Sequence, residues 1–180
     1  LINTISFCFM MNEVELKFLE IDVAAAIAKL ESIGAKKAFD GDMKAVYFEN
    51  PAKTLREQKQ VLRVRQEGDK AVVAFKQKQT SELAQVSDET EVIVSDYQTT
   101  KNIFLKLGFT VKKEFVKHRI SYKLDNFSFE IDTLEGIPTF LEIEALSEDS
   151  IKEAVALLGL DLADGKDWNG FAVKEYYDKK

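Results

Sequence analysis

Three segments of the chain repeat apolar residues with the spacing of one face of an α-helix. They are residues 22–34, 96–108 and 147–159. Each begins at an aspartate or a serine, which cap the amino end of helices well, and each ends at a glycine, which often closes them. The expected apolar faces are Ile27, Leu30 and Ile33, then Ile103, Phe104 and Leu107, and finally Ile151, Val155 and Leu158.

Most of the remaining chain alternates polar and apolar residues with a period of two, which is typical of β-strands. An internal repeat accompanies this pattern. Residues 13–17 lead into the first helix as residues 89–93 lead into the second, and a basic strand and a hairpin follow each helix. Two β-α-β-β-β halves supply about eight strands, enough to close a small barrel. The predicted fold is therefore α+β: an eight-stranded antiparallel closed β-barrel from two β-α-β-β-β repeats, with helices packed outside.

No linker rich in Pro, Gly or Ser divides the sequence, which contains only two prolines and eight glycines. We therefore expect a single domain over residues 11–180 and a tail over residues 1–10. The tail is apolar but carries no basic residue and no cleavage pattern, so a signal peptide is not expected. The alternative is that the tail adds an edge strand to the sheet.

Charged residues recur along the predicted strands as pairs of one sign, two positions apart. Such residues point to the same side of a strand, and the residues between them are mostly apolar, so each strand has a charged face and an apolar face. The pairs are Glu13/Glu15, Arg63/Arg65, Lys76/Lys78, Glu89/Glu91, Lys117/Arg119, Glu130/Asp132 and Glu142/Glu144.

Two interpretations of these charged faces are open. The simpler one is that water solvates them while the apolar faces form the core. Neighbouring like charges repel, however, so the sorting by sign favours an inner cavity that binds ligands of opposite charge. Converging carboxylates suit Mg²⁺ or Mn²⁺, and converging Arg and Lys side chains suit a polyphosphate.

The second interpretation predicts a tunnel with a cationic wall and an acidic wall. Arg63 and Glu130 hold matching positions in the two repeats, and each would represent one wall. Removal of Glu142 or Glu144 should relieve repulsion in the acidic wall and leave the fold stable.

Overall charge and the remaining motifs narrow the function. The formal net charge of −6 argues against duplex nucleic acid as a partner. A single cysteine suits the reducing cytoplasm, and no apolar run reaches membrane-spanning length.

Glycine-rich phosphate loops, zinc-binding spacings and Ser/His/Asp sets are absent from the sequence. The period of two places His118 on an apolar face, which favours a structural role for this histidine. We expect a small-molecule partner and a monomer or homodimer.

The charged strands resemble, in their order along the chain, the CYTH superfamily of triphosphate tunnel metalloenzymes. Residues 13–17, Glu-Val-Glu-Leu-Lys, are similar to its ExExK signature, and the resemblance covers roughly residues 11–158. It implies an eight-stranded tunnel that binds a triphosphate together with Mg²⁺ or Mn²⁺. The implied metal ligands are Glu13, Glu15, Glu130, Asp132, Glu142 and Glu144. The implied triphosphate-binding residues are Lys17, Arg63, Arg65, Lys76, Lys78, Lys117 and Arg119, of which Lys17, Arg63 and Arg119 are the catalytic candidates.

Two reactions would use such a site. Water attacking the terminal phosphorus gives hydrolysis, whereas a ribose 3′-hydroxyl attacking the α-phosphorus gives cyclic AMP and pyrophosphate, as in class IV adenylyl cyclases. We favour hydrolysis, because water needs no nucleoside pocket, with cyclisation as the alternative. A non-catalytic polyphosphate-binding module is a third hypothesis, but it would need no acidic set. The carboxyl end, with Trp168-Asn169-Gly170-Phe171 and Tyr176-Tyr177, departs from the Ser-Tyr pattern of many cyclase-like members.

Overall fold

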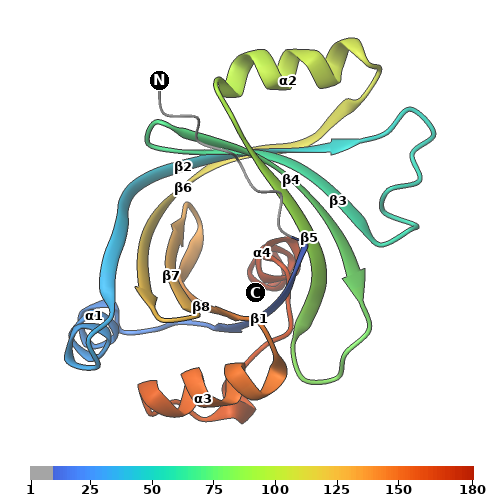
Figure 1. Ribbon diagram of the computed structural model, residues 1–180. Coiled ribbons are helices and arrows are strands. Elements are labelled where there is room, and N and C mark those ends of the chain that lie inside the picture. The colour runs from blue at the N-terminus through green and yellow to red at the C-terminus, as the bar shows by residue number, and fades with distance from the viewer. Residues whose placement is uncertain (1–9) are drawn as a thin grey trace. The chain divides into compact units, whose positions relative to one another are not determined.

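Eight antiparallel strands close into a barrel in the computed structural model, which describes residues 10–180 (Figure 1). The strands follow the order β1-β5-β4-β3-β2-β6-β7-β8 around the barrel. The predicted fold class is confirmed. Residues 1–9 of the predicted tail lie outside the described residues, and Met10 already belongs to β1. The strands are β1 Met10–Phe18, β2 Lys36–Glu49, β3 Gln60–Glu67, β4 Lys70–Gln79, β5 Gln85–Val94, β6 Thr110–Leu124, β7 Phe127–Leu134 and β8 Ile137–Ala145.

Helices connect some of the strands and follow the last one. Three of them lie where the sequence predicts them, and the short η1 turn and α4 were not predicted. Among residues 10–180, no helix is long and apolar enough to cross a membrane. The helices are α1 Val23–Ser32, α2 Tyr97–Lys106, α3 Glu148–Leu158, the 3₁₀ helix η1 Leu162–Asp164 and α4 Gly170–Asp178.

The chain forms two compact units. Of the described residues, the first unit comprises 10–11, Met43–Gln79 and Ser87–Val116, and the second comprises Asn12–Asp42, Thr80–Val86 and Lys117–Lys180. The division runs through β1, β2, β5 and β6, and the strands of both units belong to one closed barrel. Each unit has a hydrophobic core of its own.

The core of the second unit lies between the strands and two helices. Leu16 of β1 and Ile143 of β8 are almost completely buried, in one cluster with Leu30 of α1 and with Ile151 of α3. The helices begin and end where their sequence signals predict. The Asp22 side chain accepts a hydrogen bond from the Ala25 backbone N–H at 3.0 Å. The apolar faces of these strands are therefore covered by helices, which leaves their charged faces to the interior of the barrel.

The core of the first unit is built around α2. Phe104 packs on Phe48 of β2, with ring centroids 5.2 Å apart, beside the buried residues Leu62 and Val64 of β3. The side chain of Asp96 accepts from the Thr99 backbone N–H, which confirms the predicted start of this helix.

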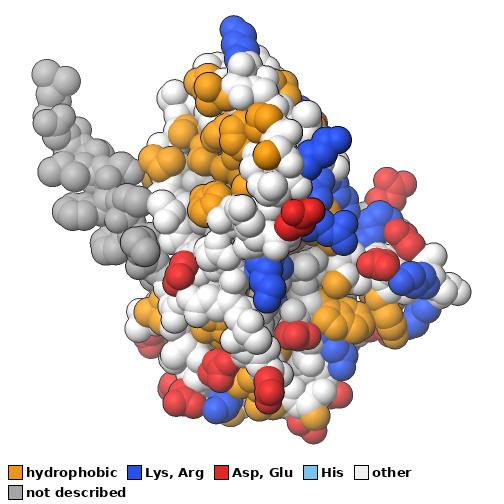
Figure 2. Space-filling model, turned by 90° about the vertical axis from the view of Figure 1, so that its right-hand side faces the viewer, with side chains coloured by type: hydrophobic (Ala, Val, Ile, Leu, Met, Phe, Trp, Pro, Cys, Tyr) orange, Lys and Arg blue, Asp and Glu red, His pale blue; other side chains and the backbone are white. Residues whose placement is uncertain are grey.

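The predicted apolar face of α2 is wrong in part. Phe104 is packed into the core, but Ile103 is 52% exposed and Leu107, just beyond the helix, is 63% exposed. The barrel surface beneath α2 accommodates one apolar row of the helix rather than the whole predicted face. Apolar side chains consequently reach the surface of the first unit. Figure 2 shows hydrophobic side chains gathered in the upper part of one face of the molecule.

The carboxyl-terminal segment packs back onto β1 and β8. Lys166 exchanges two backbone hydrogen bonds with Lys17, at 2.9 and 2.8 Å, as a short antiparallel bridge. The Asn169 side chain caps α4 by accepting from the backbone N–H groups of Phe171 and Ala172. Val173 of α4 is completely buried against β8. An asparagine followed by glycine was a usable signal for this helix start.

Gly165 lets this segment approach β1, and its replacement should destabilise the protein. A Cβ atom added there would lie 2.4 Å from Cδ2 of the buried Leu16. We expect Gly165→Ala to lower the free energy of unfolding by about 1–3 kcal/mol through overpacking. Gly170→Ala is the matched control, because nothing lies within 4 Å of the added Cβ atom. It should leave stability unchanged or raise it by about 0.5 kcal/mol. Urea unfolding of both variants measures the difference, and equal stabilities would contradict the close approach.

Candidate functional site

The charged residues of β1 lie on the face opposite the helix-covered core. Glu15 and Lys17 alternate with Leu16 and Phe18, and all four are buried, so both faces of the strand are removed from water. A closed barrel explains this double burial, because the face turned away from the helices points into its interior.

The strand order groups the charged pairs by sign. The acidic pairs belong to β7, β8, β1 and β5, which are consecutive in the barrel. The basic pairs belong to β4, β3 and β6, with β2 between the last two. Lys17 is the basic residue within the acidic group.

Three glutamates of the second unit form a compact carboxylate group. Glu13, Glu15 and Glu144 each offer an oxygen within 4.8 Å of the others. Glu15 and Glu144 are paired residues of the β1–β8 ladder. The Gln85 side-chain amide donates a hydrogen bond to Glu15, which holds that carboxylate in place. Three converging carboxylates are ligands of the kind that Mg²⁺ and Mn²⁺ prefer.

The raised pKa of Glu144 indicates that this carboxylate group lacks neutralising positive charge. Burial, together with the neighbouring carboxylates of Glu13 and Glu142, raises the pKa of Glu144 well above its ordinary value. The raised pKa favours the protonated form of Glu144. A bound cation would neutralise the carboxylate in place of this proton. The carboxylate group fits a bound divalent cation for this reason as well as for its ligand chemistry.

Lys17 is held between two carboxylates beside this group. Its Nζ atom lies 2.9 Å from Glu15 and 2.8 Å from Glu142. Burial alone would lower the pKa of Lys17, but Glu142 and Glu15 outweigh burial and raise it. The pKa of Glu142 is held well below its ordinary value, because Lys17, Arg119 and Lys117 outweigh the effect of its burial. Both groups are thus charged at neutral pH.

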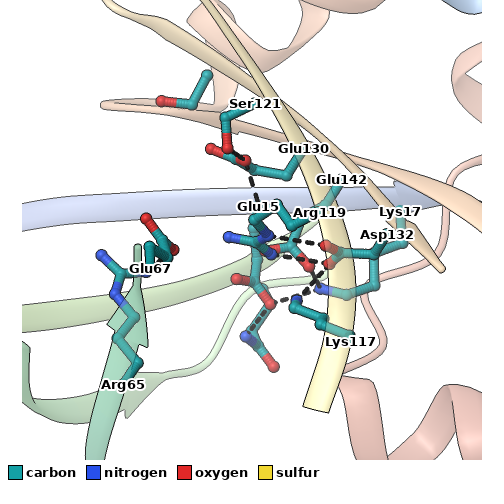
Figure 3. A network of polar contacts seen from close by, with 12 residues as sticks. Glu15, Lys17, Arg65, Glu67, Lys117, Arg119, Ser121, Glu130, Asp132 and Glu142 are labelled. Atoms are coloured by element: carbon teal, nitrogen blue, oxygen red, sulfur yellow. Dashed lines mark hydrogen bonds and ion pairs between the residues drawn. The ribbon is translucent and has the colours of Figure 1, made fainter. Parts of the chain in front are cut away.

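Arg119 forms the second part of the network, which Figure 3 shows from close by. Its Nε and Nη2 atoms each donate to a different oxygen of Asp132 at 2.7 Å. Lys117 also pairs with Asp132, and the Ser121 hydroxyl donates to Glu130. Two of the six expected metal ligands, Glu130 and Asp132, therefore have cations and a hydroxyl as partners. Of the six, the structure brings Glu13, Glu15 and Glu144 together in the compact group.

The remaining expected phosphate-binding residues belong to the first unit. Arg63 Nη2 lies 3.5 Å from Glu89, and Lys76 Nζ lies 3.3 Å from the same carboxylate. Arg65 Nη2 donates to Glu91 at 3.1 Å. The Nε atom of Arg65 is buried and has no hydrogen-bond partner among residues 10–180, which suits an anion acceptor. Lys78, on the same face of β4 as Lys76, is half-buried.

His118 does not lie in an apolar core as its position in the alternation suggests. Its imidazole is 46% exposed, with Nε2 at 3.2 Å from Asp40 and Nδ1 at 3.4 Å from Asp42. The two aspartates on neighbouring β2 make this part of the outer face polar, which the alternation within β6 alone could not reveal.

Sequence reasoning missed two polar residues that touch the site. Gln85 precedes the acidic pair of β5 by an even number of positions, and Ser121 follows the basic pair of β6 in the same way. An even spacing puts each on the charged face of its strand. Extending the period of two to uncharged polar residues would have found both.

Comparison with known proteins agrees with this geometry. The CYTH domain family matches residues 11–158, and the chain belongs to that family. A protein of Methanocaldococcus jannaschii that carries the provisional name adenylate cyclase is 32% identical over 149 residues, which cover 81% of this chain and 83% of that protein. A solved structure from Pyrococcus horikoshii is 28% identical, with a TM-score of 0.73 and coverage of 89% of this chain and 98% of that one.

A more distant structure shares the fold. A Hippeastrum protein, provisionally called an adenylyl cyclase and described as having a dominant triphosphatase activity, is 16% identical. Its TM-score is 0.62, and the match covers 93% of this chain and 96% of that one. The fold therefore occurs in proteins given two different reaction names.

Glu144 and Glu142 should affect stability in opposite directions, which revises the expectation from sequence for Glu142. A carboxyl whose pKa is raised on folding stabilises the folded state at low pH. That contribution is lost as the pH rises from 4.5, the ordinary pKa of the carboxyl in the unfolded chain, through the raised pKa of the folded state. Glu144→Gln should therefore unfold at higher urea than the unmodified chain at pH 7, without metal, and the gain should vanish below about pH 4.

Glu142→Gln is the matched substitution on the same strand. The lowered pKa of Glu142 means that its contribution is present above 4.5 and lost as pH falls. Its loss leaves the buried Lys17 ammonium with Glu15 alone, so we expect destabilisation by about 3 kcal/mol at pH 7. Urea unfolding of both variants between pH 4 and pH 8, with a chelator present, makes the comparison. Equal shifts for the two variants would contradict these charge assignments.

Proposed function

We propose that this chain is a divalent-metal-dependent enzyme that hydrolyses the phosphoanhydride chain of a triphosphate. The observation that carries the proposal is the compact group of Glu13, Glu15 and Glu144 beside the buried cations Lys17 and Arg119. A site that binds a phosphate chain through a metal needs carboxylates and cations close together, and the second unit supplies both.

The carboxylate group would hold the metal, with Glu142 as a neighbouring ligand candidate. A bound Mg²⁺ or Mn²⁺ would supply charge neutralisation at the phosphate oxygens. Glu130 and Asp132 keep Arg119 and Lys117 in position, so we assign them a supporting role rather than direct ligation.

The cations would bind and orient the triphosphate. Arg119 is fixed by its two-pronged contact with Asp132, so it can meet developing negative charge without reorganising. Lys17 stays protonated throughout, because its carboxylate partners favour the charged form. The remaining phosphate-binding candidates are Arg63, Arg65, Lys76, Lys78 and Lys117. Their carboxylate partners would exchange for phosphate oxygens on binding.

Adenylyl cyclisation is the second candidate, supported by the name of the M. jannaschii relative. It would use the same residues but would also require a ribose 3′-hydroxyl aligned with the α-phosphorus. Hydrolysis requires only water, which makes it the simpler outcome of the same arrangement. The reaction described for the Hippeastrum protein is consistent with hydrolysis on this fold.

Product analysis distinguishes the candidates. ATP, tripolyphosphate and thiamine triphosphate are each incubated with the protein and Mg²⁺ or Mn²⁺, with chelator controls. We expect orthophosphate, absent with chelator and reduced at least about a hundredfold in Glu144→Gln. Asp40→Asn, an exposed carboxylate on the outer face, is the matched control and should retain activity. Cyclic AMP as the main product would identify a cyclase, and binding without any product would identify a non-catalytic module.

Arg63→Ala should weaken triphosphate binding without altering metal binding. Loss of one charge-assisted contact costs roughly 1.5–3 kcal/mol, so the Michaelis constant should rise about ten- to a hundredfold. Arg63→Lys should recover part of this, because lysine cannot make a two-pronged contact. The exposed Arg56 supplies the control variant Arg56→Ala. Calorimetric titration of Mn²⁺ and of a non-hydrolysable triphosphate measures both affinities. Unchanged triphosphate affinity in Arg63→Ala would remove this residue from the site.

A further inference from the structure

A cavity of about 660 Å³ lies on the outer side of the second unit, away from the carboxylate group. Phe18 forms part of its floor, and Phe18 points to the same side of β1 as the core residue Leu16, opposite Lys17. The cavity is bounded by the end of β1, by α1, by the segment from the end of α3 to Lys166, and by α4. The proposed metal ligands and phosphate-binding residues do not line it.

The interior of the cavity is apolar. Phe18, Leu30 and Leu141 are buried and form the floor, and Leu158 and Leu160 contribute a wall. A cavity of this volume with mainly apolar walls is the usual setting for a small organic ligand. The binding energy would come from covering these side chains.

The charged groups at the rim favour an anion. Glu20 already accepts from the Tyr177 hydroxyl at 2.8 Å and from Lys180 at 3.3 Å. Asp22 is engaged as the cap of α1. The ammonium groups of Lys29 and Lys166 form no ion pair with any residue of the described chain, and Asp164 is the remaining carboxylate. Glu20 and Asp22 thus already have partners, whereas Lys29 and Lys166 are available to contact an anionic group of a ligand.

We propose that this cavity binds a compact molecule with an apolar body and a single anionic group. The body would lie on Phe18, Leu30 and Leu141, and the anionic group would meet Lys29 and Lys166. The cavity lies next to the charged network in the β1–β8 ladder. Phe18 and Leu141 are paired residues, and they adjoin Lys17 and Glu142 in the chain. The proposal concerns binding alone and is independent of the reaction proposed above.

The aromatic anion 8-anilinonaphthalene-1-sulfonate is a suitable probe. Trp168 is the chain's single tryptophan, and its ring lies 5.1 Å from that of Tyr176, which lines the cavity. Bound probe should therefore fluoresce and quench Trp168 emission with the same saturation curve. Lys29→Glu should weaken binding about tenfold, because it replaces an attractive charge by a repulsive one. Ala26→Phe fills the cavity from α1 and should abolish the Trp168 response.

Two control variants test whether the probe binds in this cavity. Lys70→Glu changes net charge equally at the exposed first residue of β4 and should leave the affinity unchanged. Leu107→Ser removes an exposed apolar side chain after α2 and should also leave the Trp168 response unchanged. Equal effects of Lys29→Glu and Lys70→Glu would overturn the proposal, as would a Trp168 response lost in Leu107→Ser. Circular dichroism verifies folding, and Lys29→Glu remains decisive if Ala26→Phe does not fold.

Discussion

Charged side chains removed from water are the constraint on which the inner face of this barrel depends. An ion moved from water into a protein interior loses several kcal/mol of solvation, which only nearby opposite charge and hydrogen bonds can offset. Lys17 and Arg119 satisfy this condition with Glu142, Glu15 and Asp132. The order of the strands must therefore place some strands with cationic side chains beside strands with acidic ones.

The alternation of a strand links the core to the site. In β1, every residue from Val14 to Phe18 is buried, with apolar side chains under the helices and charged ones inside. A shift of one residue in the β1–β8 pairing would place Lys17 under α1 and Leu16 in the interior. The hydrophobic core thus fixes the register, and the register fixes which carboxylates meet Lys17. Stability and chemistry are set by the same hydrogen-bonded ladder.

The sequence was informative where a property depends on near neighbours in the chain. The helix caps at Asp22, Asp96 and Ser147 and the two-residue alternation are local, and they led to the barrel. The exposure of Ile103 and the setting of His118 depend on which element lies opposite, and a single strand or helix does not encode that. The η1 turn and α4 were missed because segments this short give a weak periodic signal, although Asn169 marks the start of α4.

The roles within the charged set were the least predictable feature, for a similar reason. The sequence presents Glu130, Asp132, Glu142 and Glu144 as equivalent acidic residues. Pairing across strands separates them, since Asp132 lies opposite Arg119 and Glu142 opposite Lys17, whereas Glu144 lies opposite Glu15. The last pairing joins like charges, and so does that of Glu142 with Glu130 across the β7–β8 ladder.

The pairing of Glu15 with Glu144 marks where a cation is required, because Lys17, Arg119 and Lys123 already contact the other pair of like charges, Glu130 and Glu142. The six carboxylates of the second unit, Glu13, Glu15, Glu130, Asp132, Glu142 and Glu144, face the four cations Lys17, Lys117, Arg119 and Lys123. The cations pair with carboxylates opposite or beside them, and the excess negative charge remains at Glu13, Glu15 and Glu144, which converge on one another. A proton on Glu144 relieves one unit of it, while a divalent ion relieves two and can still accept phosphate oxygens. The excess negative charge and its position thus follow from the order of the strands.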